Sequence, residues 1–404
     1  MKILLICPRL CHGGAERVAV CLANGFVERG HHVRFMADLF EEQSFTLDNR
    51  VKLINLISTN DSKIKKWGGA IKNVRKEIRR TPPDVIIGIM PLCSFISKIA
   101  TLGLNIPVIA TEHDSFERPI SAPMSKTLQF NKFCINKIYD GVTVLTRADK
   151  IIIGKRLKNV MVMPNPLATN PIDIIPNKEK NIFAAGRVDN WHVKGFDVLI
   201  NAWRLLIMRN GENEKMRDWK LQIAGVWRNE NTIPYLTGLI PDGEWTSKKE
   251  RGEKREESTV WRSEKYRIEF LGFRNDMEEL YKKSSIFVLS SRYEAFGLVL
   301  IEAMSQGCAP VACDYKGRQR EILSPLQGDS LKVNGYSDHG IEVTENGILC
   351  EPDNVEALTS ALKKMMVDEE YRKEVQRNAI ERSKFYNKEH TMDRWEEYLK
   401  IVIS

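Results

Sequence analysis

Residues 290–312 read SSRYEAFGLVLIEAMSQGCAPVA, and they directly follow a predicted buried strand at residues 286–289. Two acids stand eight positions apart in this stretch: Glu294 falls in a loop, and Glu302 falls inside a helix that we expect to start near Gly297. A strand, a glycine turn and a helix in this order form the repeating unit of parallel α/β sheets. The stretch therefore predicts the α/β class and places two carboxylates at one sheet edge.

The start of this helix predicts an anion site. The first backbone N–H groups of a helix carry partial positive charge, which suits a leaving diphosphate; here they belong to Gly297, Leu298 and Val299. Glu302 would be costly if buried without partners, and the vicinal hydroxyls of a ribose would satisfy both of its oxygens. Glu294 can likewise accept from a sugar hydroxyl. Two structural carboxylates held in ion pairs are the alternative interpretation.

Short β-branched runs alternate with amphipathic helical patterns on both sides of this stretch, which predicts parallel sheets with right-handed crossovers. The expected strands are 3–6, 32–37, 51–56, 84–89, 107–111 and 141–145, then 181–185, 221–224, 268–271, 286–289, 310–312 and 348–350. The polar stretch 169–180, which contains prolines, separates the two series. We therefore expect two doubly wound, Rossmann-like domains that face a cleft, at 1–175 and 176–385, with a helix over 386–404 packing back on the first.

Composition excludes several classes of protein. The 404-residue chain is 43% hydrophobic and 28% charged, which is typical of a globular protein. No apolar run approaches the ~18–20 residues of a membrane-spanning helix, and the run at 3–8 is too short for a signal peptide, so we expect a cytoplasmic protein. Eight cysteines include no C-x-x-C pair, and no Asp-x-Asp occurs, so we expect neither a zinc site nor metal-dependent chemistry.

Positive charge is concentrated in the first part of the chain. Residues 1–178 hold 26 Lys+Arg and 15 Asp+Glu, a surplus of 26 − 15 = +11, whereas the whole chain has +8. The stretch 63–80, KIKKWGGAIKNVRKEIRR, has apolar residues at helical spacing on one side and cations on the other. It fits a helix packed on its own domain, or one that binds an anionic membrane surface or a pyrophosphate. The candidate ligands on this helix are Lys63, Lys65, Lys66, Lys72, Arg75 and Lys76.

Two further strand-to-helix loops could hold phosphate groups. Gly13 and Gly14 follow the first strand and precede a helix, so backbone N–H groups can approach an anion closely; a plain tight turn is the alternative. Arg187 and Lys194 flank the loop after the strand at 181–185, where two cations can clamp two phosphates.

In this order the motifs resemble the retaining, nucleotide-sugar-dependent glycosyltransferases of family four, which have the two-domain GT-B fold. The similarity covers nearly the whole chain, and its most specific part is the Glu294–Glu302 element. The resemblance implies that Gly13, Gly14, Arg187 and Lys194 hold the donor diphosphate, and that Glu302 holds the ribose. It also implies that Glu294, Gly297, Leu298 and Val299 contact the transferred sugar and its phosphate. Phe273 and Arg274 would border the nucleobase.

The first domain would contribute His113, in the segment Ala110-Thr-Glu-His-Asp114, because family members commonly have a histidine near the donor sugar; a structural histidine is the alternative. The catalytic set implied by the resemblance is His113, Arg187, Lys194 and Glu294. No cofactor is expected, because the nucleotide-sugar is a co-substrate, with UDP favoured by family frequency. The expected acceptor is a glycan, lipid-linked at the inner membrane face, in surface polysaccharide or glycoconjugate synthesis. We expect no nucleic-acid partner.

Retention implies attack from the face of the leaving group, with the departing phosphate oxygen taking the acceptor proton. Covalent double displacement by Glu112 or Glu294 is the alternative mechanism. A nucleotide-sugar 2-epimerase of similar fold and a non-catalytic partner subunit are the alternative functions.

Residues 228–267 depart from the family pattern. They form a highly charged excursion, which we interpret as a mobile surface segment or as a binding loop.

Overall fold

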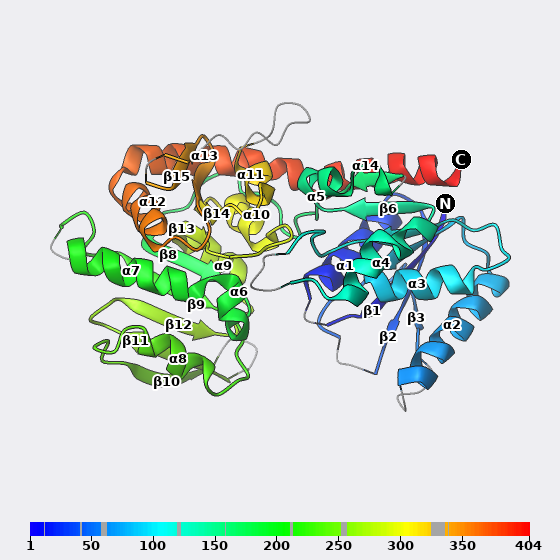
Figure 1. The fold of residues 1–404 in the computed structure, drawn as a ribbon, viewed down its shortest axis with the longest axis horizontal. Helices are drawn as coiled ribbons and strands as arrows, with labels where there is room; N and C mark the ends of the chain where they lie inside the picture. The colour runs from blue at the N-terminus through cyan, green and yellow to red at the C-terminus, as the bar shows by residue number, and fades with distance from the viewer. Residues whose placement is uncertain are drawn as a thin grey trace. The chain divides into compact units, whose positions relative to one another are not determined.

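The computed structural model describes residues 1–404 except 12, 41–42, 58–62, 119–122, 158, 211–212, 252–256, 325–335 and 338. The chain divides into two compact units (Figure 1). Unit 1 comprises Met1–Ala168 and Tyr386–Ser404, and unit 2 comprises Thr169–Phe385. The expected boundary at residue 175 lies inside unit 2, because the Ile172 N–H donates to the Ser305 carbonyl at 2.9 Å and ties this segment there.

Unit 1 is a seven-stranded parallel sheet in the order β3-β2-β1-β4-β5-β6-β7 with helices on its faces. Its strands are β1 Lys2–Arg9, β2 His32–Asp38, β3 Lys52–Asn55, β4 Val85–Ile89, β5 Val108–Thr111, β6 Gly141–Val144 and β7 Val160–Val162. Its α-helices are α1 Gly14–Glu28, α2 Lys63–Arg80, α3 Met90–Ala100, α4 Lys126–Phe133, α5 Arg147–Ile153 and α14 Lys388–Ile403. Short 3₁₀ helices, η1 Ile135–Ile138 and η2 Gly154–Arg156, complete it.

The last helix, α14, belongs to unit 1 although it follows unit 2 in the chain. The Tyr398 hydroxyl donates to the carbonyls of Val142 and Asn159, and the rings of Trp395 and Phe26 meet edge to face at 6.2 Å. Trp395 and Tyr398 are both almost completely buried. The core of unit 1 is therefore completed by residues from the end of the chain.

Unit 2 is a nine-stranded sheet in the order β10-β11-β12-β9-β8-β13-β14-β16-β15. Its strands are β8 Glu179–Ala185, β9 Lys220–Ala224, β10 Thr246–Arg251, β11 Glu257–Ser263, β12 Ile268–Gly272, β13 Ser284–Leu289, β14 Ala309–Cys313, β15 Ile341–Thr344 and β16 Gly347–Cys350. Its α-helices are α6 Trp191–Lys194, α7 Phe196–Asn210, α8 Thr232–Gly238, α9 Met277–Lys283, α10 Leu298–Ser305, α11 Arg318–Leu323, α12 Val355–Val367 and α13 Glu369–Ser383. Two 3₁₀ turns are η3 Val188–Asn190 and, at the passage to unit 1, η4 Lys384–Tyr386.

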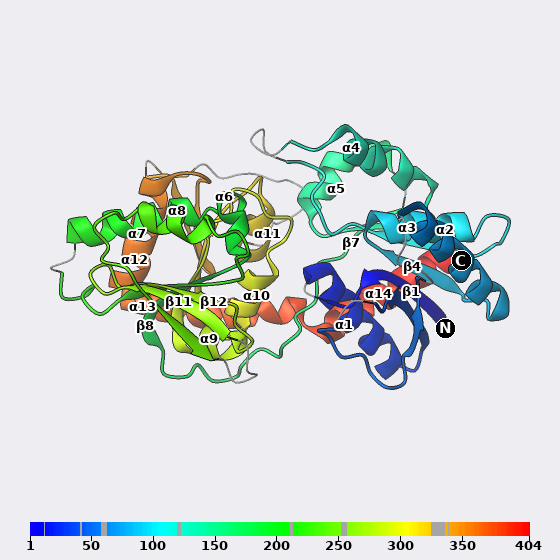
Figure 2. The same cartoon turned by 90° about the horizontal axis from the view of Figure 1, so that it is seen from below.

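Alternating residues of β8 separate the two faces of this sheet. Ile182 and Ala184 belong to the core cluster that α7, α8 and α12 cover, whereas the Phe183 ring packs edge to face on Tyr281 of α9, 5.6 Å away. Figure 2 shows α6, α7 and α8 on one side of the sheet and α9 on the other.

The prediction of a loose excursion at 228–267 is wrong for most of that segment. Residues 232–238 form α8, and β10 and β11 form an antiparallel hairpin that pairs with β12 and extends the sheet. Trp261 is paired in register with Phe270 of β12, and the Trp245 ring lies 5.7 Å from the same phenyl ring. These apolar residues anchor the hairpin despite its charge, and its tip at 252–256 lies outside the described residues.

Candidate active site

The loops that follow β8 and β13 are joined by backbone and side-chain contacts. The Ser290 hydroxyl donates to the Lys194 carbonyl at 2.8 Å, and the Arg292 N–H donates to the Val193 carbonyl at 3.0 Å. Gly195 adopts φ +63°, and a Cβ there would lie only 2.0 Å from the Ser290 carbonyl oxygen. Only glycine permits this left-handed conformation together with so close a backbone approach.

Arg292 fastens the same two loops through its guanidinium. It forms a bidentate ion pair with Asp197 at 2.7 and 2.8 Å, contacts Asp353 at 2.7 Å and donates to the His192 carbonyl at 2.7 Å. Hydrogen bonding to Asp197 is the main reason that the pKa of Arg292 is raised. Sequence reasoning missed Arg292. The signal that could have indicated its role was an arginine in the loop after β13 together with an acid at the start of α7.

This joining brings Lys194 and Glu294 together. The Lys194 Nζ lies 2.6 Å from Glu294 Oε2, and the two side chains are 22% and 17% exposed, so solvent still reaches the pair. Arg187 is exposed on the same β8 loop, and its guanidinium forms no hydrogen bond or ion pair with the described residues. The site therefore offers one cation already balanced by a carboxylate and one that is available.

The helix after Glu294 begins as expected from the sequence. Gly297 is the N-cap of α10 with φ +99°, and no side chain in the described residues caps the helix, which leaves the N–H groups that begin with Leu298 and Val299 to other acceptors. Glu302 is only 5% exposed, and the Tyr281 hydroxyl donates weakly to it at 3.4 Å. At the end of β12, Phe273 is 39% exposed, while the Arg274 guanidinium is paired with Asp276 at 2.5 Å. That pairing limits Arg274 as a ligand for a nucleobase.

Gly13, Gly14 and His113 lie in unit 1, so the predicted site residues are divided between the two units. Gly13 is the N-cap of α1, and the Glu16 carboxylate folds back against it: a Cβ on Gly13 would lie 1.8 Å from Glu16 Oε2. Glu16 is also paired with Arg9 at 3.2 Å. An anion arriving at Gly13 and Gly14 would thus meet an internal carboxylate, which the sequence did not indicate.

His113 follows β5 in a mainly apolar surrounding. Its Nε2 lies 3.1 Å from the Thr111 hydroxyl, and its buried Nδ1 has no hydrogen-bond partner among the described residues. Burial lowers the pKa of His113 to about 4, and the neighbouring Asn165 side chain opposes this only in part. His113 and Asn165 line a cavity of about 10 Å³, which has room for a single water molecule. The imidazole is therefore neutral at physiological pH.

Glu112, the other acid considered as a nucleophile, lies in a buried ion pair. The Lys132 Nζ is 2.7 Å from Glu112 Oε2, both side chains are at most 2% exposed, and the Asn136 amide donates to the second carboxylate oxygen at 2.8 Å. This arrangement leaves Glu112 without access to a substrate.

The basic helix α2 divides its cations between internal and exposed positions. Lys66 is paired with Asp38 at 2.7 Å, and Arg75 donates to the carbonyls of Ala100 and Leu102, so the side chains of these two predicted ligands are already engaged within unit 1. Their contacts are with neighbouring elements of unit 1, which spacing along one helix cannot reveal. The side chain of Lys63 lies outside the described residues.

Four other cations of α2 form one exposed stripe, because positions 65, 72, 76 and 79 fall on one helix face; its members are Lys65, Lys72, Lys76 and Arg79. Arg80 lies outside the stripe and is paired with Glu77 at 2.9 Å. Helix α3 packs beside α2 (Figure 1). It exposes Leu92 at 40% and Phe95 at 38%, with Leu102 just beyond its end at 59%. Sequence reasoning missed both Arg79 and this apolar face.

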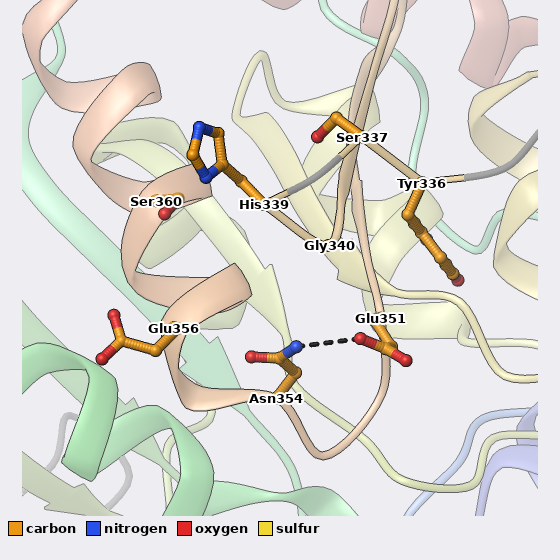
Figure 3. Close-up of a pocket in the computed structure, with 8 residues that line it drawn as sticks. All are labelled: Tyr336, Ser337, His339, Gly340, Glu351, Asn354, Glu356 and Ser360. Atoms are coloured by element: carbon orange, nitrogen blue, oxygen red, sulfur yellow. Dashed lines mark hydrogen bonds between the residues drawn. The ribbon is translucent and has the colours of Figure 1, made fainter.

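A second hollow lies away from all predicted site residues. It has a volume of about 470 Å³ and lies between the segment with Tyr336 and the start of α12 (Figure 3). Asn354 donates to Glu351 at its rim, and Glu356 is paired with Arg209. Its carboxylates make it unsuited to a diphosphate.

Among the described residues, no helix combines the length and apolarity needed to cross a bilayer. The same part of the chain holds no group of three or more His, Cys, Asp or Glu side chains placed to bind a metal ion.

Known proteins match this chain along its full length. The family model "Glycosyl transferases group 1" matches residues 170–382, and "Glycosyltransferase Family 4" matches residues 12–177. A Campylobacter jejuni enzyme, GalNAc-alpha-(1->4)-GalNAc-alpha-(1->3)-diNAcBac-PP-undecaprenol alpha-1,4-N-acetyl-D-galactosaminyltransferase, is 26% identical over 100% of this chain and 98% of its own. The amylovoran biosynthesis glycosyltransferase AmsD of Erwinia amylovora is 24% identical over 98% of this chain and 99% of its own.

Solved structures share the fold. Sucrose-phosphate synthase from Thermosynechococcus elongatus has a TM-score of 0.72 at 17% identity, covering 98% of this chain and 97% of its own. Anabaena HepE in complex with UDP and glucose has a TM-score of 0.70 at 18% identity, covering 99% of both chains. The family models match most of the chain and the architecture is shared with solved glycosyltransferases, so the chain belongs to the family-4 glycosyltransferases with the GT-B fold.

Proposed function

We propose that this glycosyltransferase moves a sugar from a UDP-sugar to a hydroxyl of a lipid-linked glycan, without a metal ion and with retention at the anomeric carbon. The observation that carries the proposal is the joined pair of loops, which gathers Lys194, Glu294 and the uncapped start of α10 at one sheet edge. Positive groups collected there can stabilise the charge that develops on a departing diphosphate. UDP is favoured because HepE, which shares the fold, binds it.

In the proposed reaction, the bond between the sugar C1 and the β-phosphate oxygen breaks, and its electron pair passes to the phosphate. Arg187, Lys194 and the first N–H groups of α10 stabilise this negative charge. The acceptor hydroxyl attacks C1 from the same face, and the departing phosphate oxygen takes its proton. Glu294 releases Lys194 toward the phosphate and accepts a hydrogen bond from a sugar hydroxyl, while Glu302 accepts from the ribose.

A thermal-shift panel of UDP-, GDP- and ADP-sugars, run with and without EDTA, tests the donor. A donor at 100 times its dissociation constant stabilises by about 2.7 kcal/mol. Stabilisation by one UDP-sugar in EDTA supports the proposal, whereas stabilisation that requires a divalent cation, or by none of the sugars, contradicts it. The anomeric configuration of the product by NMR tests retention, and a rearranged UDP-sugar formed without acceptor would point to a 2-epimerase.

The lipid-linked acceptor is supported by the surface that α2 and α3 share. The stripe of Lys65, Lys72, Lys76 and Arg79 contains no acid, since Glu77, the one acid of α2, is buried against Arg34. Helix α3, which packs on α2, also exposes apolar residues. Cations next to an apolar face suit an anionic lipid surface, where each Lys or Arg contributes about 1 kcal/mol. The Campylobacter relative is named for an acceptor carried on undecaprenol.

Co-sedimentation with phosphatidylglycerol vesicles tests this surface. Changing Lys65, Lys72 and Lys76 together to Glu is expected to weaken binding by about a hundredfold or more, because three favourable charges become repulsive. The matched control changes three exposed lysines of unit 2 to Glu: Lys283, Lys363 and Lys373. Equal vesicle binding by both variants would contradict the membrane role.

A further inference from the structure

Two aromatic rings stack on each other close to Lys194. Trp191 begins α6, the four-residue helix that Lys194 ends, and Tyr235 lies on α8. Their ring centroids are 4.2 Å apart with an interplanar angle of 24°, and Tyr235 is 46% exposed. Within the described part of the chain, neither the Trp191 Nε1–H nor the Tyr235 hydroxyl has a hydrogen-bond partner. An aromatic face and two available polar groups are thus presented together.

This pair is held in place before any ligand arrives. Asp189 accepts from the backbone N–H groups of Arg228 at 2.8 Å and Asn229 at 3.1 Å, and from the Thr232 hydroxyl at 2.9 Å. Burial acts to raise the pKa of Asp189, but these hydrogen bonds lower it overall, so the carboxylate stays ionised. One side chain therefore ties the loop that carries Trp191 to the start of the helix that carries Tyr235.

The stacked pair lies on one face of the unit 2 sheet, and the segment that follows the predicted nucleobase position leads to the other face. Helices α6 and α8 lie on the face that Ile182 and Ala184 of β8 share (Figure 2). Phe273 leads instead into α9, whose Tyr281 packs on the other face against Phe183. A donor whose nucleobase sits near Phe273 would leave the Trp191–Tyr235 pair for a different ligand.

We propose that Trp191 and Tyr235 form a saccharide subsite that stacks a pyranose ring of the acceptor glycan. The inference rests on the proposed glycosyl transfer and names the acceptor contact of the same site. The exposed face of the Tyr235 ring binds the C–H groups of one sugar face, as aromatic side chains do when one side of the ligand is apolar, and Trp191 supports that ring from behind. The indole N–H and the phenol hydroxyl, which have no partner among the described residues, are available to bind sugar hydroxyls. Trp191 lies one helical turn from Lys194 on α6, and for this reason we assign the bound sugar to the acceptor rather than to a remote site.

Saturation-transfer difference NMR on the full chain tests this subsite, with methyl α-N-acetylgalactosaminide and methyl α-glucoside as probes in saturating UDP. Ring-proton signals from one face of at least one glycoside are expected in the unchanged protein and are expected to be lost in Tyr235→Leu and Trp191→Leu. Tyr235→Phe keeps the ring and is expected to retain them. Phe385→Leu removes an exposed aromatic residue elsewhere in unit 2 and is the matched control.

The outcomes separate this inference from the proposed donor. Unchanged UDP-induced stabilisation with lost glycoside signals supports an acceptor subsite. Loss of UDP binding in Tyr235→Leu would assign the pair to the donor, and absent or unaltered glycoside signals would also overturn the inference. If UDP binds to neither the parent nor the variants, the donor proposal fails while the glycoside test still decides the subsite. With active enzyme, Tyr235→Leu is expected to raise the acceptor KM roughly three- to tenfold with the donor KM unchanged.

Discussion

Gly195→Ala is the sharpest test of the contact between the two loops of the candidate active site. Gly195 has φ +63°, and an added Cβ would lie 2.0 Å from the Ser290 carbonyl oxygen, a backbone atom that cannot rotate away. Relief of this overlap requires the loop after β8 to separate from the loop after β13. The same movement would displace Lys194 from Glu294, which are now 2.6 Å apart.

The expected loss of unfolding free energy in Gly195→Ala has two parts. An alanine in the left-handed region costs about 1–2 kcal/mol, and forcing packed atoms apart costs about 1–3 kcal/mol. The sum is about 2–5 kcal/mol, and a domain of 150–250 residues loses about 2–4 °C of melting temperature per kcal/mol, which gives roughly 4–20 °C. Turnover is expected to fall about a hundredfold, because a displacement of about 1 Å at a catalytic group has that effect.

Gly307→Ala is the matched control within unit 2. Gly307 has φ +75°, and its added Cβ would meet only side chains at ordinary contact distances of 3.4 Å or more. This variant is expected to lose only the unfolding free energy that a left-handed alanine costs, about 1–2 kcal/mol. It is expected to keep UDP-sugar binding. Thermal unfolding followed by circular dichroism, together with UDP-sugar titration, measures both effects. Equal melting temperatures and equal donor affinities for the two variants would refute the reasoning.

Three further predictions concern individual side chains. Lys194→Ala and Glu302→Ala are each expected to lower turnover about a hundredfold, or ~2.7 kcal/mol, with little change in melting temperature; turnover close to that of the parent would remove the variant residue from the site. Burial lowers the pKa of His113 from 6.5 to about 4, so between pH 4 and 6.5 the unfolded chain binds more protons than the folded chain. The free energy of unfolding of unit 1 should therefore decline as pH falls from 6.5 to 4. Denaturant titrations should show a flatter decline for His113→Asn. Lys132→Met leaves Glu112 charged and buried, and is expected to destabilise unit 1 by about 3–5 kcal/mol; a simultaneous Glu112→Gln change should recover much of this loss.

Local patterns in the sequence were sufficient to predict the central part of both sheets. The β-branched runs predicted the parallel strands at the centre of both sheets, and the glycine at 297 predicted where α10 begins. The family resemblance and the GT-B fold are confirmed by the comparisons. These features depend on neighbours in the sequence, which is why periodicity and turn residues reveal them.

Contacts between distant segments could not be predicted in the same way. Arg292 and Asp197 lie 95 positions apart, and the sequence gives no reason to pair that arginine with that acid. The charged run near residue 250 indicated a loop because its composition hides the few apolar side chains that anchor the hairpin. On α2, spacing identified a basic face, but only tertiary structure shows that Lys66 and Arg75 have partners within unit 1.

The return of α14 to unit 1 has a consequence for synthesis on the ribosome. Residues 1–168 emerge first, yet Trp395 and Tyr398, which cover part of their core, follow only after the 217 residues from 169 to 385. At roughly 5–20 residues per second, this interval lasts about 10–40 s. During that time the nascent N-terminal part exposes the apolar surface around Phe26 to chaperones and other chains, so its maturation waits until α14 has been synthesised.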